Sequence, residues 1–194
     1  MDHELLERID LIERMVSEGR RGTQYWGWSL ALWGSGQLIA SIWSTYGHHP
    51  TLAWGVTMAA CAIVTTIGVS RRRATEHSQS FLSRAIWSIW LSLGISMALL
   101  GFLGHAAGVL TGRAFLVVFF SLMGFTYMAT GLILQWKVQW GIGLLWWAAA
   151  IVALYGPDWL LGWLFLAMVF LGEVVLGLYL MVREKADTRN ARAA

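Results

Sequence analysis

The chain has 194 residues, of which 57% are hydrophobic and only 13% are charged, with a net charge of +3. Soluble domains carry about 25% charged residues, so this chain has too few polar side chains to cover a folded core in water. It is also too hydrophobic to be an intrinsically disordered protein. The single cysteine excludes an internal disulfide, and the basic residues stand in short clusters between apolar runs, a pattern that disfavours nucleic-acid binding. The composition therefore predicts a polytopic membrane protein.

The first predicted element is a cytoplasmic amphipathic helix within residues 1–24. The apolar residues Leu5, Ile9, Ile12 and Val16 recur at steps of three and four and form one stripe. Between Asp2 and Glu18 there are six acidic residues and two arginines, a balance that an anionic membrane surface would repel, so the stripe is interpreted as a docking surface for protein. The segment lacks the apolar core of a cleavable signal peptide, and we expect none to be removed.

Six apolar stretches follow, each long enough to cross the roughly 30 Å hydrocarbon core of a bilayer as a helix. The spans are predicted at about 25–46, 51–70, 85–104, 114–136, 138–155 and 157–182, and a basic cytoplasmic tail follows at 183–194. The expected fold class is an all-α integral membrane protein, with a six-helix transmembrane bundle over residues 25–182 arranged as three hairpins.

The distribution of basic residues predicts the orientation. Thirteen of the 14 Lys and Arg residues fall on one side of the six spans, and only Arg113 falls on the other. By the positive-inside rule, both termini are expected in the cytoplasm and the protein in the inner (plasma) membrane. Most of the 13 tryptophans stand near span ends, as interfacial anchors do. Scarce lysine beside abundant arginine points to a bacterial source.

The three predicted hairpins share a pattern. Cys61, Tyr127 and Glu173 each lie ten residues before the basic end of a descending helix, so we expect them at one depth. The pattern is compatible with an internal hairpin repeat, with a three-plus-three inverted repeat, or with unrelated hairpins that each have a basic inner end.

Glu173 is the one charged residue well inside a predicted span. A charge at the bilayer centre costs at least about 2.5–3.5 kcal/mol, so Glu173 should face the bundle interior and either find a partner or remain protonated. Candidate partners at similar depth are Gln37, Tyr127 and Thr130. The functional hypothesis is a proton or cation site. The alternatives are a neutral acid that joins helices through hydrogen bonds, and a residue beside a water-filled vestibule.

Two further groups of residues are candidates for binding. Three tryptophans lie deeper than the interfacial ones, where their faces could hold a lipophilic cation beside Glu173 or simply fill space: Trp33, Trp146 and Trp147. Four residues stand at the expected outer turns and are of types that bind zinc, copper or iron: His48, His49, His105 and Asp158. No cofactor is predicted, and a metal or haem site at the outer face stays open beside ordinary surface histidines.

These patterns predict a small permease- or transporter-like protein in which Glu173 is a proton or cation site. The alternative is a non-enzymatic structural or regulatory subunit of a larger membrane complex that docks through the N-terminal helix. No nucleophile–base pair is recognisable, so no enzymatic activity is predicted. The expected partners are the lipid bilayer and either further copies of the chain or a larger complex.

Overall fold

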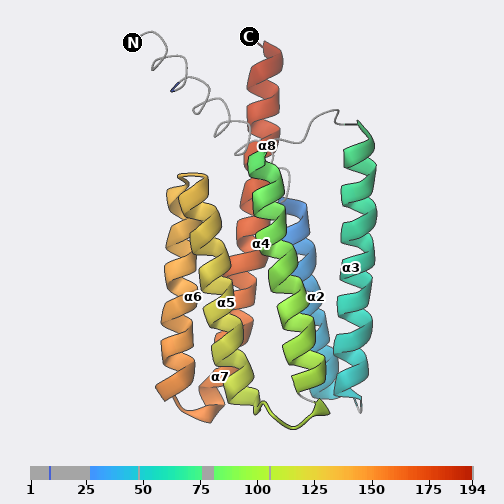
Figure 1. Ribbon diagram of the computed structural model, residues 1–194, viewed down its shortest axis with the longest axis vertical. Helices are drawn as coiled ribbons and strands as arrows, with labels where there is room; N and C mark the ends of the chain where they lie inside the picture. Colours follow the sequence, from blue (N-terminus) through green and yellow to red (C-terminus); the bar gives the residue numbers. More distant parts are fainter. Residues whose placement is uncertain (1–8, 10–26, 48, 76–80, 105, 194) are drawn as a thin grey trace. The chain divides into compact units, whose positions relative to one another are not determined.

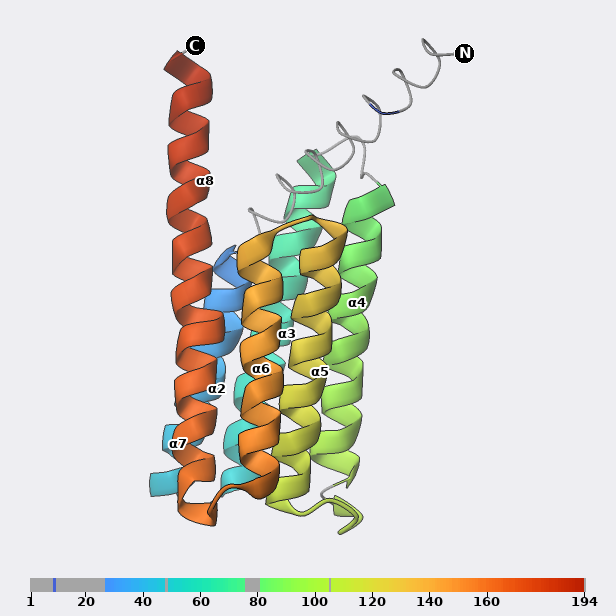
Figure 2. The ribbon, with the colours of Figure 1, turned by 90° about the vertical axis from the view of Figure 1, so that its left-hand side faces the viewer.

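The computed structural model describes residue 9 and residues 27–47, 49–75, 81–104 and 106–193, and within these it is all-helical (Figures 1 and 2). The α-helices are α2 (Gly27–Tyr46), α3 (Pro50–Thr75), α4 (Phe81–Ala98), α5 (Gly112–Ile133), α6 (Lys137–Tyr155), α7 (Asp158–Val169) and α8 (Leu176–Ala193). Two segments are π-helical: η1 (Leu99–Gly104) follows α4, and η2 (Phe170–Val175) joins α7 to α8.

Five helical stretches in the described part of the chain are long and apolar enough to cross a membrane: Pro50–Arg71, Leu82–Gly104, Gly112–Ile133, Lys137–Tyr155 and Asp158–Ala186. They correspond to the predicted second to sixth spans, so the chain is a helical protein with several potential transmembrane helices. The first predicted span, α2, is an uncharged helix of 20 residues but is not among the five. Its Gln, Gly, Ser and Thr residues make it less apolar than the others.

The fourth span is predicted to end at a later residue than the helix does. α5 ends at Ile133 and not at Trp136, because Gln135 adopts a left-handed φ of 50°. The N–H of Gln135 donates to the carbonyl of Leu132 at 3.2 Å, and that of Trp136 to the carbonyl of Gly131 at 2.7 Å. This pairing is a Schellman motif, which satisfies the last helical carbonyls and turns the chain directly into α6.

The last helix continues beyond its apolar segment. α8 runs to Ala193, so the predicted tail at 183–194 is helical almost throughout. At the N-terminus, only Ile9 of the predicted docking stripe is described, and its side chain is exposed. Leu5, Ile12 and Val16 lie outside the described residues, and docking through this helix stays a prediction.

The described helices belong to two compact units. One contains α4, η1, α5, α6 and α7 as far as Met168, and the other contains α2, α3, η2 and α8. In the first unit, α5 and α6 form a close hairpin (Figure 2). A Cβ on Gly143 of α6 would lie 2.8 Å from the backbone nitrogen of Met128 and 2.9 Å from the carbonyl oxygen of Gly124. The two backbones therefore touch where only glycine fits.

Aromatic side chains fill the core of the first unit. Trp146 of α6 is fully buried, stacks on Tyr127 with 6.4 Å between ring centroids, and meets Phe119 and Phe120 at 5.7 and 5.6 Å. Phe165 of α7 adds a ring 5.6 Å from Phe119. These separations are typical of favourable aromatic pairs, so this cluster supplies much of the packing between α5, α6 and α7.

In the second unit, α2 is packed on two sides. A Cβ on Gly27 would lie 2.7 Å from the carbonyl oxygen of Gly177 on α8, and one on Gly177 would lie 2.6 Å from the backbone nitrogen of Ala31. On the other side, a Cβ on Gly36 would lie 2.5 Å from the Cys61 sulfur of α3. Small residues on both faces of α2 thus permit close approach of α3 and α8.

Candidate functional site

The candidate site is built around Glu173, in the π-helical segment η2. Only 2% of this residue is exposed. The side-chain amide of Gln37 on α2 donates from Nε2 to the carboxyl Oε2 at 2.8 Å. The other carboxyl oxygen, Oε1, is buried and accepts no hydrogen bond from the residues described. Of the three predicted partners, the structure brings Gln37 to Glu173.

The local backbone explains how the carboxyl reaches α2. The N–H of Leu176 bonds to the carbonyl of Leu171, five residues earlier, as well as to that of Glu173, which defines the wide π turn. On the facing helix, a Cβ on Gly34 would lie 2.7 Å from the Cβ of Glu173. The glycine therefore provides the space in which the glutamate side chain begins, one turn from the amide that binds its end.

A thiol lies at the same level of α2. Cys61 of α3 is buried, and its Sγ lies 3.8 Å from the carbonyl oxygen of Leu32, to which it is positioned to donate. The sulfur contacts α2 at Gly36, the residue next to Gln37. A carboxyl from η2 and a thiol from α3 therefore meet α2 within a few residues of its own amide, Gln37.

The chemistry available at this site is that of one carboxyl group. Oε2 already accepts the Gln37 hydrogen bond, so Oε1 is the atom at which a proton can bind. A single carboxylate can balance one positive charge, and the amide directs an N–H donor towards it. In apolar surroundings an isolated ion is costly, so a bare carboxylate at this place needs either a proton or a cation to neutralise it.

The other two predicted partners belong to the first unit. Tyr127 is fully buried, with its ring edge-on to Trp90 at 5.1 Å and stacked on Trp146. Thr130 is also fully buried, and its hydroxyl donates to the carbonyl of Thr126 at 2.8 Å. Both are engaged within their own unit, and their approach to Glu173 stays a prediction.

The three deep tryptophans have different surroundings. Trp33 of α2 donates from its indole nitrogen to the hydroxyl of Thr65 on α3 at 3.0 Å. Trp146 lies in the aromatic core, and its indole nitrogen has no hydrogen-bond partner in the described part of the chain. Trp147 is 37% exposed and donates to the carbonyl of Ser121 at 3.1 Å. Each ring has a packing role of its own, and a shared aromatic pocket stays a prediction.

The predicted outer-face residues are partly described. His48 and His105 lie outside the described residues, and His49 is exposed at the start of α3. Within the described ranges, no group of three or more His, Cys, Asp or Glu side chains is arranged to hold a metal ion. Asp158, the fourth candidate, accepts a hydrogen bond from Arg113 Nη2 at 2.6 Å.

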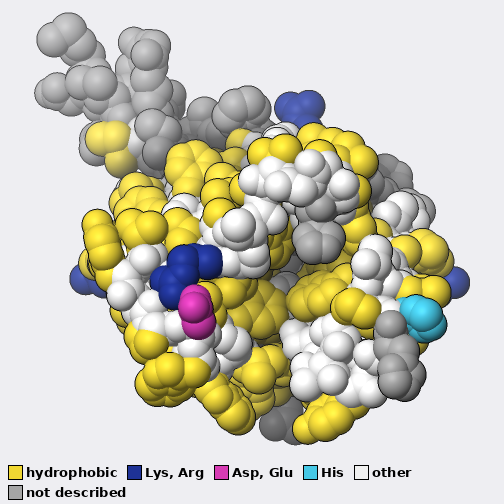
Figure 3. Space-filling model, turned by 90° about the horizontal axis from the view of Figure 1, so that it is seen from below, with side chains coloured by type: hydrophobic (Ala, Val, Ile, Leu, Met, Phe, Trp, Pro, Cys, Tyr) yellow, Lys and Arg dark blue, Asp and Glu magenta, His cyan; other side chains and the backbone are white. Residues whose placement is uncertain are grey.

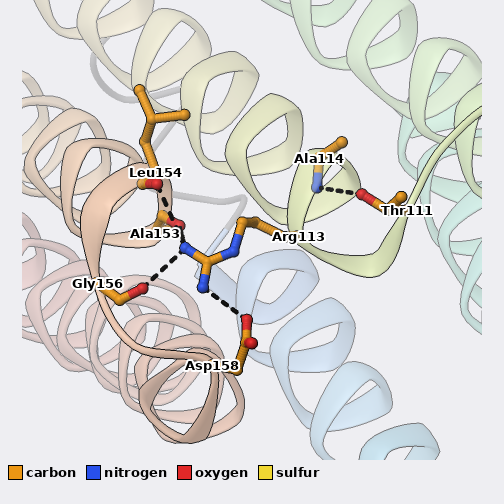
Figure 4. Close-up of polar contacts among 7 residues, drawn as sticks. All are labelled: Thr111, Arg113, Ala114, Ala153, Leu154, Gly156 and Asp158. Carbon is orange, nitrogen blue, oxygen red and sulfur yellow. Dashed lines mark hydrogen bonds and ion pairs between the residues drawn. The ribbon is translucent and has the colours of Figure 1, made fainter.

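Arg113 makes a polar cluster that the sequence reading missed (Figure 4). Its Nη1 donates to the carbonyl oxygens of Ala153 at 2.7 Å and Gly156 at 2.8 Å, while Nη2 binds Asp158. The guanidinium therefore satisfies carbonyls at the end of α6 and fixes the turn into α7. On the face shown in Figure 3, an acidic side chain lies against basic atoms in a mainly hydrophobic or uncharged surface. The signal in the sequence was the one basic residue on the predicted outer side.

Comparison of the chain with models of protein families, with curated protein sequences and with solved structures finds no match.

Proposed function

We propose that the chain is a small multi-pass membrane protein of the permease or transporter type, in which the Glu173 carboxyl exchanges a proton. The observation that carries the proposal is the combination of near-complete burial, a single hydrogen bond from Gln37 to Oε2, and a second oxygen free to take a proton. Ionisable groups inside transmembrane segments commonly mark ion pathways and proton relays.

The proposal includes α2 as a sixth span. α2 packs against α3 at Gly36 and against α8 at Gly27, and both partners belong to stretches able to cross a membrane. A helix covered by protein on two sides needs less apolar surface than one facing lipid. Six spans return the chain to its starting side, and the basic residues then place both termini in the cytoplasm of, we infer, a bacterial cell.

The direct test is proton flux into liposomes that contain the purified protein. The vesicles enclose a pH-sensitive dye, and a potassium gradient with valinomycin sets the membrane potential. We expect the wild type to carry protons and Glu173→Gln to lose that flux, because an amide side chain does not take up and release a proton under the conditions of the assay. Glu184→Gln, the same substitution eleven residues further along the chain in α8 and beyond the predicted sixth span, is the control and should retain the flux.

Two results would count against the proposal. If Glu173→Gln carried protons as fast as the wild type, Glu173 would be a structural residue. If wild-type vesicles carried no more protons than empty ones, the transport proposal would be wrong. In that case the alternative, a subunit of a larger membrane complex, would be tested by whether a partner co-purifies with the wild type and is lost when Leu5, Ile9 and Ile12 are replaced by Asp.

A further inference from the structure

Among the described residues of the second unit, η2 is the one helical segment that is not α-helical, and it carries Glu173. Turns of this kind behave as single-residue insertions in an α-helix and occur frequently at functional sites. The segment reads Phe-Leu-Gly-Glu-Val-Val, so it holds no proline, and Glu173 is its one polar side chain. The packing of the helix within the second unit gives a reason for the turn.

The spacing of buried residues shows that requirement. Within the second unit, positions 169, 173 and 177 are all buried, and they are four residues apart twice in succession. In a regular α-helix each step of four overshoots a full turn by about 40°, so the two steps together would turn the buried face by about 80°. The wider π turn between the first and the third of these positions removes that excess in large part.

The contacts on both sides of the turn depend on the smaller rotation of the π turn. Before it, Val169 is fully buried within the second unit. After it, Gly177 is in backbone contact with Gly27 and Ala31 of α2. Glu173 lies inside the turn, against Gly34 and Gln37. The helix can satisfy the packing before and after η2, and still direct Glu173 at α2, with the wide turn in place.

We propose that η2 is the positioning element of the Glu173 site: its π geometry holds the carboxyl against Gln37, where a regular α-helix with the same packing on either side would direct it elsewhere. This inference rests on the proposed function, because it assigns η2 the part of holding the group that exchanges the proton. Loss of the wide turn changes the helix by one residue, so the two ends of η2 rotate against each other by about 100°. Glu173 lies near the middle of the six residues of η2 and rotates by about half of that angle. Such a rotation breaks a hydrogen bond of 2.8 Å.

The test is the deletion of Leu171, which removes one residue from η2 and converts the turn to regular α-helix. The Leu171 side chain is 57% exposed, so the deletion removes little packing. The matched control is the deletion of Gly162 in the regular helix α7, where a Cβ would meet nothing within 4 Å. The control deletion rotates one part of a regular helix against the other by about 100° and should lower the melting temperature strongly. The Leu171 deletion should leave the melting temperature close to that of the wild type.

The second readout is the infrared carbonyl band of the Glu173 carboxyl, assigned by subtraction of the spectrum of Glu173→Gln. In the Leu171 deletion we expect this band to move to the frequency seen in Gln37→Leu, where the amide donor is missing. An unchanged band, or a Leu171 deletion as unstable as the Gly162 deletion, would overturn the inference. The proposed function fails on a different result, namely unaltered proton flux in Glu173→Gln.

Discussion

Substitution of two neighbouring glycines of α6 by alanine tests the packing of the first unit quantitatively. A Cβ on Gly143 would lie 2.8 Å from the backbone nitrogen of Met128, whereas one on Gly141 would meet nothing within 4 Å. Ordinary van der Waals contact begins at 3.4 Å, so Gly143→Ala requires α5 and α6 to separate by about 0.6 Å. Backbone atoms on α5 cannot rotate away, so the helices themselves must move.

The difference between the two variants isolates this steric cost. Each gains about 0.8–1 kcal/mol of helix propensity on replacing glycine by alanine, and that gain cancels in the comparison. Forcing extra volume into a close contact costs about 1–3 kcal/mol. Gly143→Ala should therefore be about 1–3 kcal/mol less stable than Gly141→Ala in reversible unfolding by sodium dodecyl sulfate in mixed micelles. Equal stability of the two variants would show that α5 and α6 do not touch at this level.

Three further predictions concern individual contacts. Gly34→Ala places a Cβ 2.7 Å from the Glu173 Cβ, so it should shift the Glu173 infrared band, and an unshifted band would contradict the contact. Arg113→Gln should cost about 1 kcal/mol in thermal unfolding, since charge-assisted bonds to carbonyls are lost, and more than Asp158→Asn, because the Asp158 side chain is 89% exposed; the reverse order would refute the capping role. Trp33→Phe should cost about 1 kcal/mol more in the wild type than in a Thr65→Val background, because the bond at 3.0 Å is already lost there, and an equal cost in both would contradict the bond.

The bounds of the helices were largely predictable, because long uncharged runs separated by charged or Gly-containing turns are a strong signal. The end of α5 is an exception. Nothing in the local pattern separates Ile133 from Trp136, and the end of α5 depends on the left-handed conformation of Gln135. The turn at this residue leads directly into α6, whose backbone lies against that of α5 at Gly143, and hydropathy does not report a backbone conformation of this kind.

The candidate site was predictable in part. A lone acid in an apolar run must be sheltered, and the amide of Gln37 was a reasonable partner because amides are rare in such runs. The π turn that aims Glu173 was not predictable, since hydrogen-bond register depends on packing on both sides of the segment. The hydrogen bonds of Arg113 were not predictable either, because their acceptors are backbone carbonyls 40 or more residues away along the chain.

We propose that Glu173 exchanges a proton and does not merely join two helices. Hydrogen–deuterium exchange of the carboxylic-acid infrared band in membranes distinguishes the two roles. We expect a band that is absent in Glu173→Gln and that shifts within minutes of transfer to deuterated buffer, because a proton that leaves and returns is replaced by deuterium. A band that stays unshifted while the membranes are fully exchanged would identify a sealed structural acid and would contradict proton exchange at Glu173.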